Sequence, residues 1–552
     1  MTAHSKGILS SSDGPIVLAL LGVFACVVIF VFTFRSRRKN GPPSLPDKIP
    51  FVSNTYFFLL HTSKFFRKTR EALGNKTLAK WHLGRRTVYI INGQKNVQSL
   101  LRASPHVDSE AFMLVAMRNS WNIPEADVQR FVRDKSGRLK TPNPGTDSVR
   151  YSQRYWANVR RLYDDYLAKP RHAAALATKF IQVFSKRLDA FPLGEWAATS
   201  VFAFIKDHMS EAAITSLQGS RRLIVAPDTA ELYREYERHA FRLLWGVPRL
   251  LIPEAYRAMD EFHASSEKYL QSAWKNFEWD GPDAESDWEP HFGSRFSREL
   301  ARWIKESGLS QQAANGFFSA ILLQLNADAV PITAWMLMHL IRDQELFLAV
   351  RDEVMGVFST DPSSTRLNPM LDRAKLVKLP LLQAVYAETL RLHVSFIAMR
   401  QTKSDLDFDG RKIDKGSWVQ AVTAISHLDE AAWARDGHPA SEFWPGRHLT
   451  YRQERDEYGK LRQVVEFSLS DSAGAFFPFG GGTGICPGRN FAKQEILMAC
   501  AVIIAKFDIE PVEWINHDGS PSEREAREDE KYSGTGSMLP DRDMKILWKR
   551  LW

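Results

Sequence analysis

The sequence predicts a mainly α-helical protein with a small β-rich region and one N-terminal transmembrane helix. Residues 178–308 and 313–341 carry apolar side chains at helical spacing over long stretches. Residues 87–91 form a β-rich run that ends at the turn pair Asn92-Gly93. Residues 16–34 form an uninterrupted run of apolar and small residues. The chain has 552 residues and ordinary globular composition, with 44% hydrophobic and 25% charged residues, so we expect one large domain plus an anchor.

The anchor is expected in residues 1–40. The apolar run at 16–34 is nineteen residues long, enough for a helix to cross the hydrocarbon layer of a bilayer. Basic residues follow it at once between positions 35 and 39, which predicts a single-pass helix with the rest of the chain in the cytosol. A cleaved signal peptide is the alternative, but its apolar region is usually shorter and its basic cluster comes first. Residues 41–50 then form a proline-rich hinge, and residues 51–552 the main domain.

The charge distribution argues against a nucleic-acid-binding protein. The formal net charge is +9, but lysine and arginine are spread among many acidic residues without a dominant basic tail. We therefore expect a membrane surface and acidic protein partners, and no nucleic acid.

One cysteine lies in a setting typical of a metal ligand. The chain has three cysteines, of which Cys26 and Cys500 lie in apolar segments. Cys486 follows the glycine-rich run 480–484 and precedes an apolar helix, a position that favours a thiolate. A lone cysteine without a CxxC pair or a nearby histidine pair argues against zinc and iron–sulfur sites and fits a haem iron. A phosphate-binding loop is the alternative, but no Lys-Ser or Lys-Thr pair follows the glycines.

The spacing of Phe479, Gly482, Cys486 and Gly488 resembles the cysteine-ligand signature of the cytochrome P-450 superfamily. The resemblance implies the mainly α cytochrome P-450 fold, a haem-thiolate catalytic domain at 51–552 and haem b with Cys486 as the axial iron ligand. Phe479, Gly482 and Gly488 would shape the loop around the cofactor. The anchor and hinge resemble microsomal members of the family, and the glycine-rich variant of the loop is similar to filamentous-fungal members of secondary metabolism.

The apolar segment 313–341 is the candidate for the helix that faces the haem. In most of the family its centre holds an acid followed by a threonine, which together help deliver protons to dioxygen. Here Asp328 matches the acid, Ala329 replaces the threonine, and Thr333, one turn later, is a substitute candidate. Pro331 should open or kink the helix, because proline cannot donate the helical hydrogen bond. The proline position is similar to the branch of sterol 7α-hydroxylases and prostacyclin synthase.

Further motifs imply supporting roles. Glu388, Arg391 and Arg447 match the family's buried triad, with His448 where the family has phenylalanine. Trp156 and Arg160, four residues apart on a helix, and Arg400 are expected to contact haem propionates.

Two features near the cofactor are less defined by the sequence. Many members carry a basic residue two positions before the cysteine, where this chain has Gly484, so one propionate contact is missing or supplied elsewhere. Val394, Phe396 and Ile397 are candidate apolar contacts for substrate.

These expectations describe a haem-thiolate monooxygenase in the endoplasmic reticulum membrane. It would hydroxylate or otherwise oxidise a lipophilic terpenoid, steroid-like, polyketide or alkaloid substrate in a tailoring step of secondary metabolism. It would use O2 and electrons from NADPH through a separate reductase, because only 66 residues follow Cys486. The missing threonine leaves two alternatives open: an oxygen-independent haem-thiolate isomerase or dehydratase, and a catalytically silent haem or lipid binder in the membrane.

Overall fold

The computed structural model describes residues 42–103, 105–359, 370–455 and 458–552. The expected transmembrane helix at 16–34 and Cys26 lie outside the described residues, and the boundaries of the three expected segments stay predictions. The mainly helical fold with a smaller β-rich part is confirmed.

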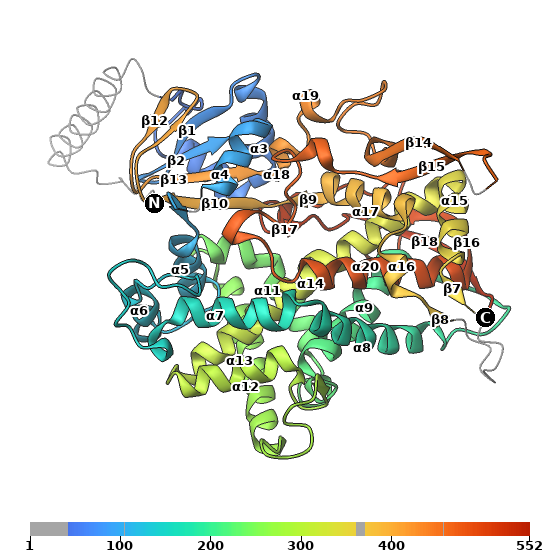
Figure 1. Ribbon diagram of the computed structural model, residues 1–552, viewed down its shortest axis with the longest axis horizontal. Coiled ribbons are helices and arrows are strands. Elements are labelled where there is room, and N and C mark those ends of the chain that lie inside the picture. The colour runs from blue at the N-terminus through green and yellow to red at the C-terminus, as the bar shows by residue number, and fades with distance from the viewer. Residues whose placement is uncertain (1–41, 104, 360–369, 456–457) are drawn as a thin grey trace, which may run out of the picture.

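Helices make up about half of the described chain, and Figure 1 shows them gathered around two long central ones, α14 and α20. The helices are α2 (Ser53–Leu60), α3 (Thr62–Leu73), α4 (Gln94–Arg102), α5 (Glu110–Asn119), α6 (Glu125–Arg133), α7 (Tyr155–Tyr163), α8 (Pro170–Leu188), α9 (Val201–Gln218), α10 (Arg221–Val225), α11 (Thr229–Leu244), α12 (Pro253–Asn276), α13 (Arg295–Glu306), α14 (Gln311–Arg342), α15 (Gln344–Met355), α16 (Arg373–Leu376), α17 (Pro380–His393), α18 (Thr423–Ser426), α19 (Glu430–Trp433) and α20 (Arg489–Lys506).

The strands form one larger sheet at one end of the molecule and several small ones (Figure 1). The larger sheet has the order β1 (Leu78–Leu83), β2 (Arg86–Ile91), β13 (Trp418–Val422), β10 (Ile397–Thr402) and β3 (Val107–Asp108). A second sheet has the order β16 (Phe507–Ile515), β18 (Asp543–Arg550) and β4 (Trp196–Ser200). The two-stranded pairs are β14 (Leu449–Arg455) with β15 (Leu461–Phe467), β9 (Val394–Ser395) with β17 (Gly536–Ser537), β11 (Leu406–Phe408) with β12 (Arg411–Ile413), β5 (Trp288–Glu289) with β6 (Gly293–Ser294), and β7 (Phe358–Ser359) with β8 (Met370–Leu371).

Helix α14 is the centre of the core. It starts at the N-cap Ser310, whose side chain accepts a hydrogen bond from the backbone of Ala313, and it runs without interruption through Pro331. It packs against α9, α12, α17 and α20. Among the described residues α14 alone is long and apolar enough to cross a membrane, but 72% of its most apolar window is buried in protein. It is therefore a core helix.

Helix α20 connects the cysteine loop to this core. Its residues from Ile496 to Ala505 are all buried, and it packs against α8, α14 and α15. Cys500, as expected, is a buried thiol within it. Because the start of α20 is fixed by this packing, the loop immediately before it is held in place beside α14.

Candidate functional site

The glycine-rich loop presents Cys486 just before α20. Gly480 and Gly482 have positive φ angles of 70° and 59°, which glycine adopts without steric cost. The backbone N–H of Cys486 donates to the carbonyl of Phe479 over 2.9 Å, and a short 3₁₀ turn at Gly482–Gly484 precedes the cysteine. The loop before the cysteine therefore closes on itself through backbone hydrogen bonds.

The thiol of Cys486 lies in a recess enclosed by the fold. The residue is exposed, yet burial is the largest influence on its pKa, which rises to about 11. The backbone N–H groups of Gly488 and Arg489 act in the opposite direction, as expected at a helix start. The helix start thus favours the thiolate, as expected, but desolvation outweighs these two N–H groups and the net effect is a raised pKa of the Cys486 thiol. A metal cation bound to the sulfur would favour its deprotonated form.

The recess suits a single-cysteine metal cofactor. Within the described ranges, no cluster of three or more His, Cys, Asp or Glu side chains is arranged to hold a metal ion. A metal ion at Cys486 would therefore have this cysteine as its one ligand among the described side chains, an arrangement that fits a haem iron better than a protein-ligated zinc ion.

Helix α14 faces the cysteine through Asp328. The charge of Asp328 contributes to the raised pKa of Cys486, so the two groups lie within electrostatic reach. Asp328 Oδ1 accepts hydrogen bonds from the backbone N–H and the hydroxyl of Ser537, at 2.7 and 3.1 Å. Gly536 packs so closely on Asp328 that a Cβ there would collide with the carboxylate. Asp328 thus fixes the β17 segment over the recess, and burial raises its pKa despite these bonds.

Ala329 and Thr333, the other two α14 residues at the expected proton-delivery positions, are both buried. Ala329 is 2% exposed and carries no polar side-chain atom. The hydroxyl of Thr333 donates to the carbonyl of Ala329 over 2.8 Å, so its proton is used within the helix. The role of Thr333 as a substitute for the missing hydroxyl stays a prediction, and the geometry gives it no partner in the recess.

Three arginines surround the cysteine loop. Arg160 donates to the carbonyl of Thr483 over 2.6 Å, and Arg400 donates to the carbonyl of Gly481 over 3.0 Å. The third, Arg138, comes from the loop at 137–147 and was not predicted from the sequence. Burial first, and then the charge of Arg160, lowers the pKa of Arg138.

The charge of Arg138 opposes those of Arg160 and Arg400, and both Arg138 and Arg400 are desolvated. Burial and the neighbouring Arg138 lower the pKa of Arg400 to about 10. Two carboxylates bound among them would relieve this repulsion, and a haem carries two propionates. The cluster and the lone exposed thiol are the features that make the site fit haem b.

Trp156 has a structural partner. Its ring N–H donates to the carbonyl of Phe131 over 2.9 Å, and its backbone N–H donates to Asp134. The side chain is buried, and the described contacts do not direct its N–H toward a carboxylate of a cofactor. Its contact with a propionate stays a prediction.

The carboxylate of Glu388 is the centre of a buried polar cluster behind the loop. Arg391 binds both of its oxygens at 2.8 Å, and Arg447 donates to Oε1 at 2.9 Å. His448, the departure from the family pattern, approaches Oε2 at 3.0 Å and is a fourth member. Although burial alone would raise it, the hydrogen bonds from Arg391 and His448 hold the pKa of Glu388 far below its usual value. Both arginines share this one carboxylate, and their other N–H groups donate to backbone carbonyls, among them those of His427, Ala440 and Pro439.

The candidate substrate contacts lie on the segment after α17. Val394 and Ile397 are buried, and Val394 pairs with Ser537 in the β9–β17 ladder. The ring of Phe396 lies near Gly480, 3.6 Å from the place where a Cβ there would be. The segment thus joins the cysteine loop to the Asp328–Ser537 contact, but its role in substrate binding stays a prediction.

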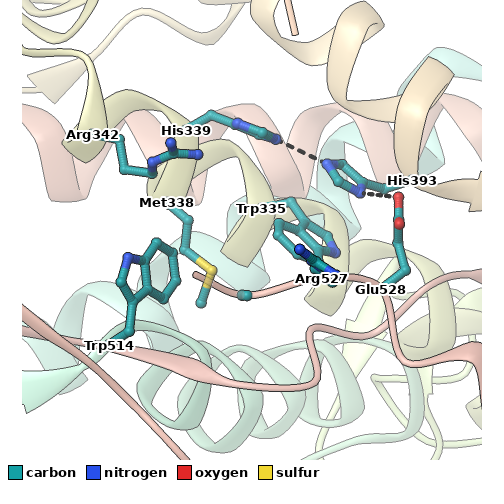
Figure 2. A pocket seen from close by; sticks show the side chains of 9 residues that line it. Trp335, Met338, His339, Arg342, His393, Trp514, Arg527 and Glu528 are labelled. Carbon is teal, nitrogen blue, oxygen red and sulfur yellow. Dashed lines mark hydrogen bonds and ion pairs between the residues drawn. The ribbon is translucent and has the colours of Figure 1, made fainter. Parts of the chain in front are cut away.

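A separate pocket of about 140 Å³ lies beside the C-terminal half of α14 (Figure 2). In it, His393 contacts His339 over 2.9 Å between their Nε2 atoms and Glu528 over 3.1 Å through Nδ1. Trp335 stacks on His393 with ring centroids 4.1 Å apart. These side chains are hydrogen-bonded to or stacked on one another. The pocket therefore lies where α14, α17 and the segment before β17 pack together.

Known proteins resemble this chain over most of its length. The sequence model of the family described as Cytochrome P450 matches residues 331–521. The chain is 39% identical to Cytochrome P450 monooxygenase calL of Penicillium decumbens, over 98% of this chain and 99% of that protein. It is 27% identical to Cytochrome P450 monooxygenase fsoE of Humicola fuscoatra, over 85% of this chain and 82% of that protein. It is 23% identical to Cholesterol 7-alpha-monooxygenase of Cricetulus griseus, over 96% of this chain and 97% of that protein.

Proposed function

Because this chain belongs to the cytochrome P450 family and is a haem-thiolate monooxygenase, we propose that it oxidises a lipophilic small molecule in a tailoring step of secondary metabolism. The observation that carries the proposal is Cys486, a lone exposed thiol in an enclosed recess beneath Asp328. Terpenoid, steroid-like, polyketide and alkaloid compounds are the substrate classes. The relative named for cholesterol 7α-oxidation supports the steroid-like class.

The chain's own residues define how the cofactor is held. Haem b, when bound, supplies the activation of dioxygen. Cys486 would ligate its iron, Phe479, Gly482 and Gly488 would shape the loop around it, and Arg138, Arg160 and Arg400 would hold its propionates. The Glu388 cluster fixes the segment after α17 and supports the loop from behind.

The residues above the recess control substrate and protons. Val394, Phe396 and Ile397 supply apolar contacts that exclude water from one side of the substrate. Asp328, oriented by Ser537, organises water at the centre of α14, and the buried Ala329 leaves space without a proton donor. Thr333 keeps its hydroxyl on the helix carbonyl and has a supporting role.

We also propose a membrane-bound enzyme of the endoplasmic reticulum, held by one helix at 16–34, with its catalytic domain in the cytosol. Exposed apolar side chains support this. Ile49, Val52 and Tyr56 lie at the start of the described chain, and Leu250 and Leu251, 91% and 69% exposed, lie between α11 and α12. Helix α2 packs against α11, so both sets belong to neighbouring elements. Electrons come from NADPH through a separate reductase, and nucleic acid is not a partner.

The test is oxygen incorporation. Microsomes that contain the full chain and a fungal NADPH reductase are supplied with a panel of steroids and terpenoids under labelled ¹⁸O₂. The proposal expects a product with one labelled oxygen that requires both NADPH and reductase. Conversion of a peroxide-bearing substrate without NADPH or O2 would instead identify the isomerase or dehydratase that Ala329 leaves open.

A further inference from the structure

A second cavity reaches α14 from the side of α9 and α11. It encloses about 620 Å³ and is lined by residues of α9, α11, α14 and the segment between β16 and β18. Val330 and Pro331 form its wall on α14, immediately after Asp328 and Ala329 in the helix. This cavity therefore brings solvent space to the part of α14 where the family's proton-delivering residues are expected.

Glu237 of α11 is a buried acid in the wall of this cavity. The residue is only 7% exposed, and among the described residues no hydrogen bond to its carboxylate is found. Burial and then the charge of Asp328 raise the pKa of Glu237 to about 8. The two carboxyl groups thus lie within electrostatic reach across the end of the cavity.

Several charged and titratable groups face Glu237. Arg234 and Arg238, on the same helix, lower its pKa, but less than burial raises it. Tyr233 and Tyr532 also lie within electrostatic reach, and burial raises the pKa of both phenols, so they stay neutral at physiological pH. The remaining charged or titratable residues of the cavity wall are Lys206, Lys531, His517, Asp529 and Asp543.

The acidic residues Asp529 and Asp543 have other partners. Asp543 accepts hydrogen bonds from the backbone of Phe202 and Ala203 at the start of α9. Asp529 accepts one from the backbone of Lys531. Glu237 is therefore the acid of this wall that is not bound to backbone N–H groups.

Pro331 removes one backbone hydrogen bond from α14 close to Asp328. Pro331 has no N–H, so it cannot bond to the carbonyl of Ala327, one residue before Asp328. A buried carbonyl without a hydrogen-bond partner is costly, and a water molecule can supply that partner beside Asp328. The chain has no hydroxyl at position 329, and the Thr333 hydroxyl is bound to the helix.

We propose that Glu237 is a proton-relay residue, which takes protons from water in this cavity and passes them through water at Pro331 to Asp328. The proposal rests on the monooxygenase function above. Hydroxylation of a substrate RH consumes O2, two electrons from the reductase and two protons, and yields ROH and H2O. The relay supplies those two protons in place of the missing threonine hydroxyl, and Glu237 acts only through Asp328.

The pH dependence has a definite sign. A group with a pKa near the working pH is suited to proton transfer. Glu237 holds a proton below about pH 8 and loses it above, so oxygen reduction that depends on the relay should slow as pH rises through 8. Replacing the carboxyl group of Glu237 should abolish this fall in rate near pH 8.

The experiment compares Glu237→Gln with Glu231→Gln in the full-length haem-loaded enzyme with reductase. Glu231 is an exposed acid on the same helix. Turnover is measured without added substrate, as NADPH oxidation and peroxide release between pH 6.5 and 9, in H2O and D2O. For Glu237→Gln we expect an approximately tenfold slower NADPH oxidation, a larger solvent isotope effect and no step near pH 8. Glu231→Gln should match wild type.

Glu237→Asp is the second variant, because it keeps an ionisable group and should recover part of the rate and the step. The relay is refuted if Glu237→Gln keeps the wild-type rate and pH profile. It is equally refuted, whatever the folding of the variants, if the wild-type profile has no step between pH 7 and 9. A wild-type chain that binds no haem or oxidises no NADPH would instead refute the proposed function.

Discussion

The guanidinium group of Arg400 occupies the space beside Gly484: a Cβ at Gly484 would lie 2.6 Å from Nη2 of Arg400. This contact explains why the chain has glycine at position 484, where many members of the family have a basic residue. A side chain at 484 and the observed position of Arg400 exclude each other. Arg138 lies within electrostatic reach of Arg400 and, in the proposed cofactor site, takes the place of the cation that the loop lacks.

Gly484→Arg should therefore impair haem binding. The new side chain would displace Arg400 from its bond to the Gly481 carbonyl, and we expect haem affinity to fall at least tenfold, about 1.4 kcal/mol. Haem titration of the apoprotein measures this. The double variant Gly484→Arg/Arg400→Ala frees the space and should recover most of the affinity. If the double variant binds haem worse than Gly484→Arg alone, the steric explanation is wrong.

Arg138→Ala should accelerate haem loss. A hydrogen bond to a charged group contributes about 1.5–3 kcal/mol, so transfer of haem to apomyoglobin should become roughly 10- to 100-fold faster. Arg133→Ala, a change of an exposed arginine on the nearby α6, is the matched control and should leave the rate unchanged. Equal transfer rates for the two variants would remove Arg138 from the cofactor site.

His448→Phe restores the residue of the family pattern and removes one partner of Glu388. The buried carboxylate then lacks a hydrogen bond on Oε2, and we expect about 1–3 kcal/mol less free energy of unfolding at pH 7. His438→Phe, which affects a partly exposed pair with Glu442, should change it by less than about 0.5 kcal/mol. Chemical denaturation of the two variants decides; equal stability would contradict the role of His448.

The same cluster predicts acid sensitivity. The folded-state pKa of Glu388 lies below its usual value of 4.5, so its contribution to stability is complete above pH 4.5 and is lost as pH falls further. His448→Phe weakens the stabilisation of the charged form, so the loss between pH 4.5 and 3 should be shallower than in wild type. Thermal unfolding across this range measures it, and parallel curves would show that His448 does not hold the charge of Glu388.

Ala329→Thr tests whether the missing hydroxyl matters. Position 329 is buried one turn before Thr333, so the matched control is Ala329→Val, which adds the same bulk without a hydroxyl. If protons reach Asp328 by another route, the threonine variant should share the small loss of turnover of the valine variant. Peroxide released per NADPH is the readout. A threonine variant several-fold better coupled than wild type would show that the natural route lacks a donor at 329.

The sequence predicted the helical body, the long α14 and the β2 strand because periodic apolar patterns and turn residues are local signals. It also indicated Cys486 and the Glu388, Arg391 and Arg447 set, because their motifs are contiguous or fixed in spacing. Arg138 was missed, since its loop carries no periodic pattern and its neighbours Arg160 and Arg400 are distant in sequence.

Two electrostatic features could not be predicted without the three-dimensional fold. The raised pKa of the Cys486 thiol depends on desolvation by surrounding elements, which the local helix start does not reveal. Glu237 looks like an ordinary helical acid in sequence, and only the packing of α11 beside α14 gives it a buried place near Asp328.

The most direct test of the central claim is the difference spectrum of the reduced, carbon monoxide-bound protein, for wild type and Cys486→Ser in membranes. Thiolate ligation predicts the red-shifted band of the family in wild type and its loss in the variant. A folded, haem-loaded wild type without this band, or a variant that keeps it, would contradict the assignment of Cys486 as the haem ligand.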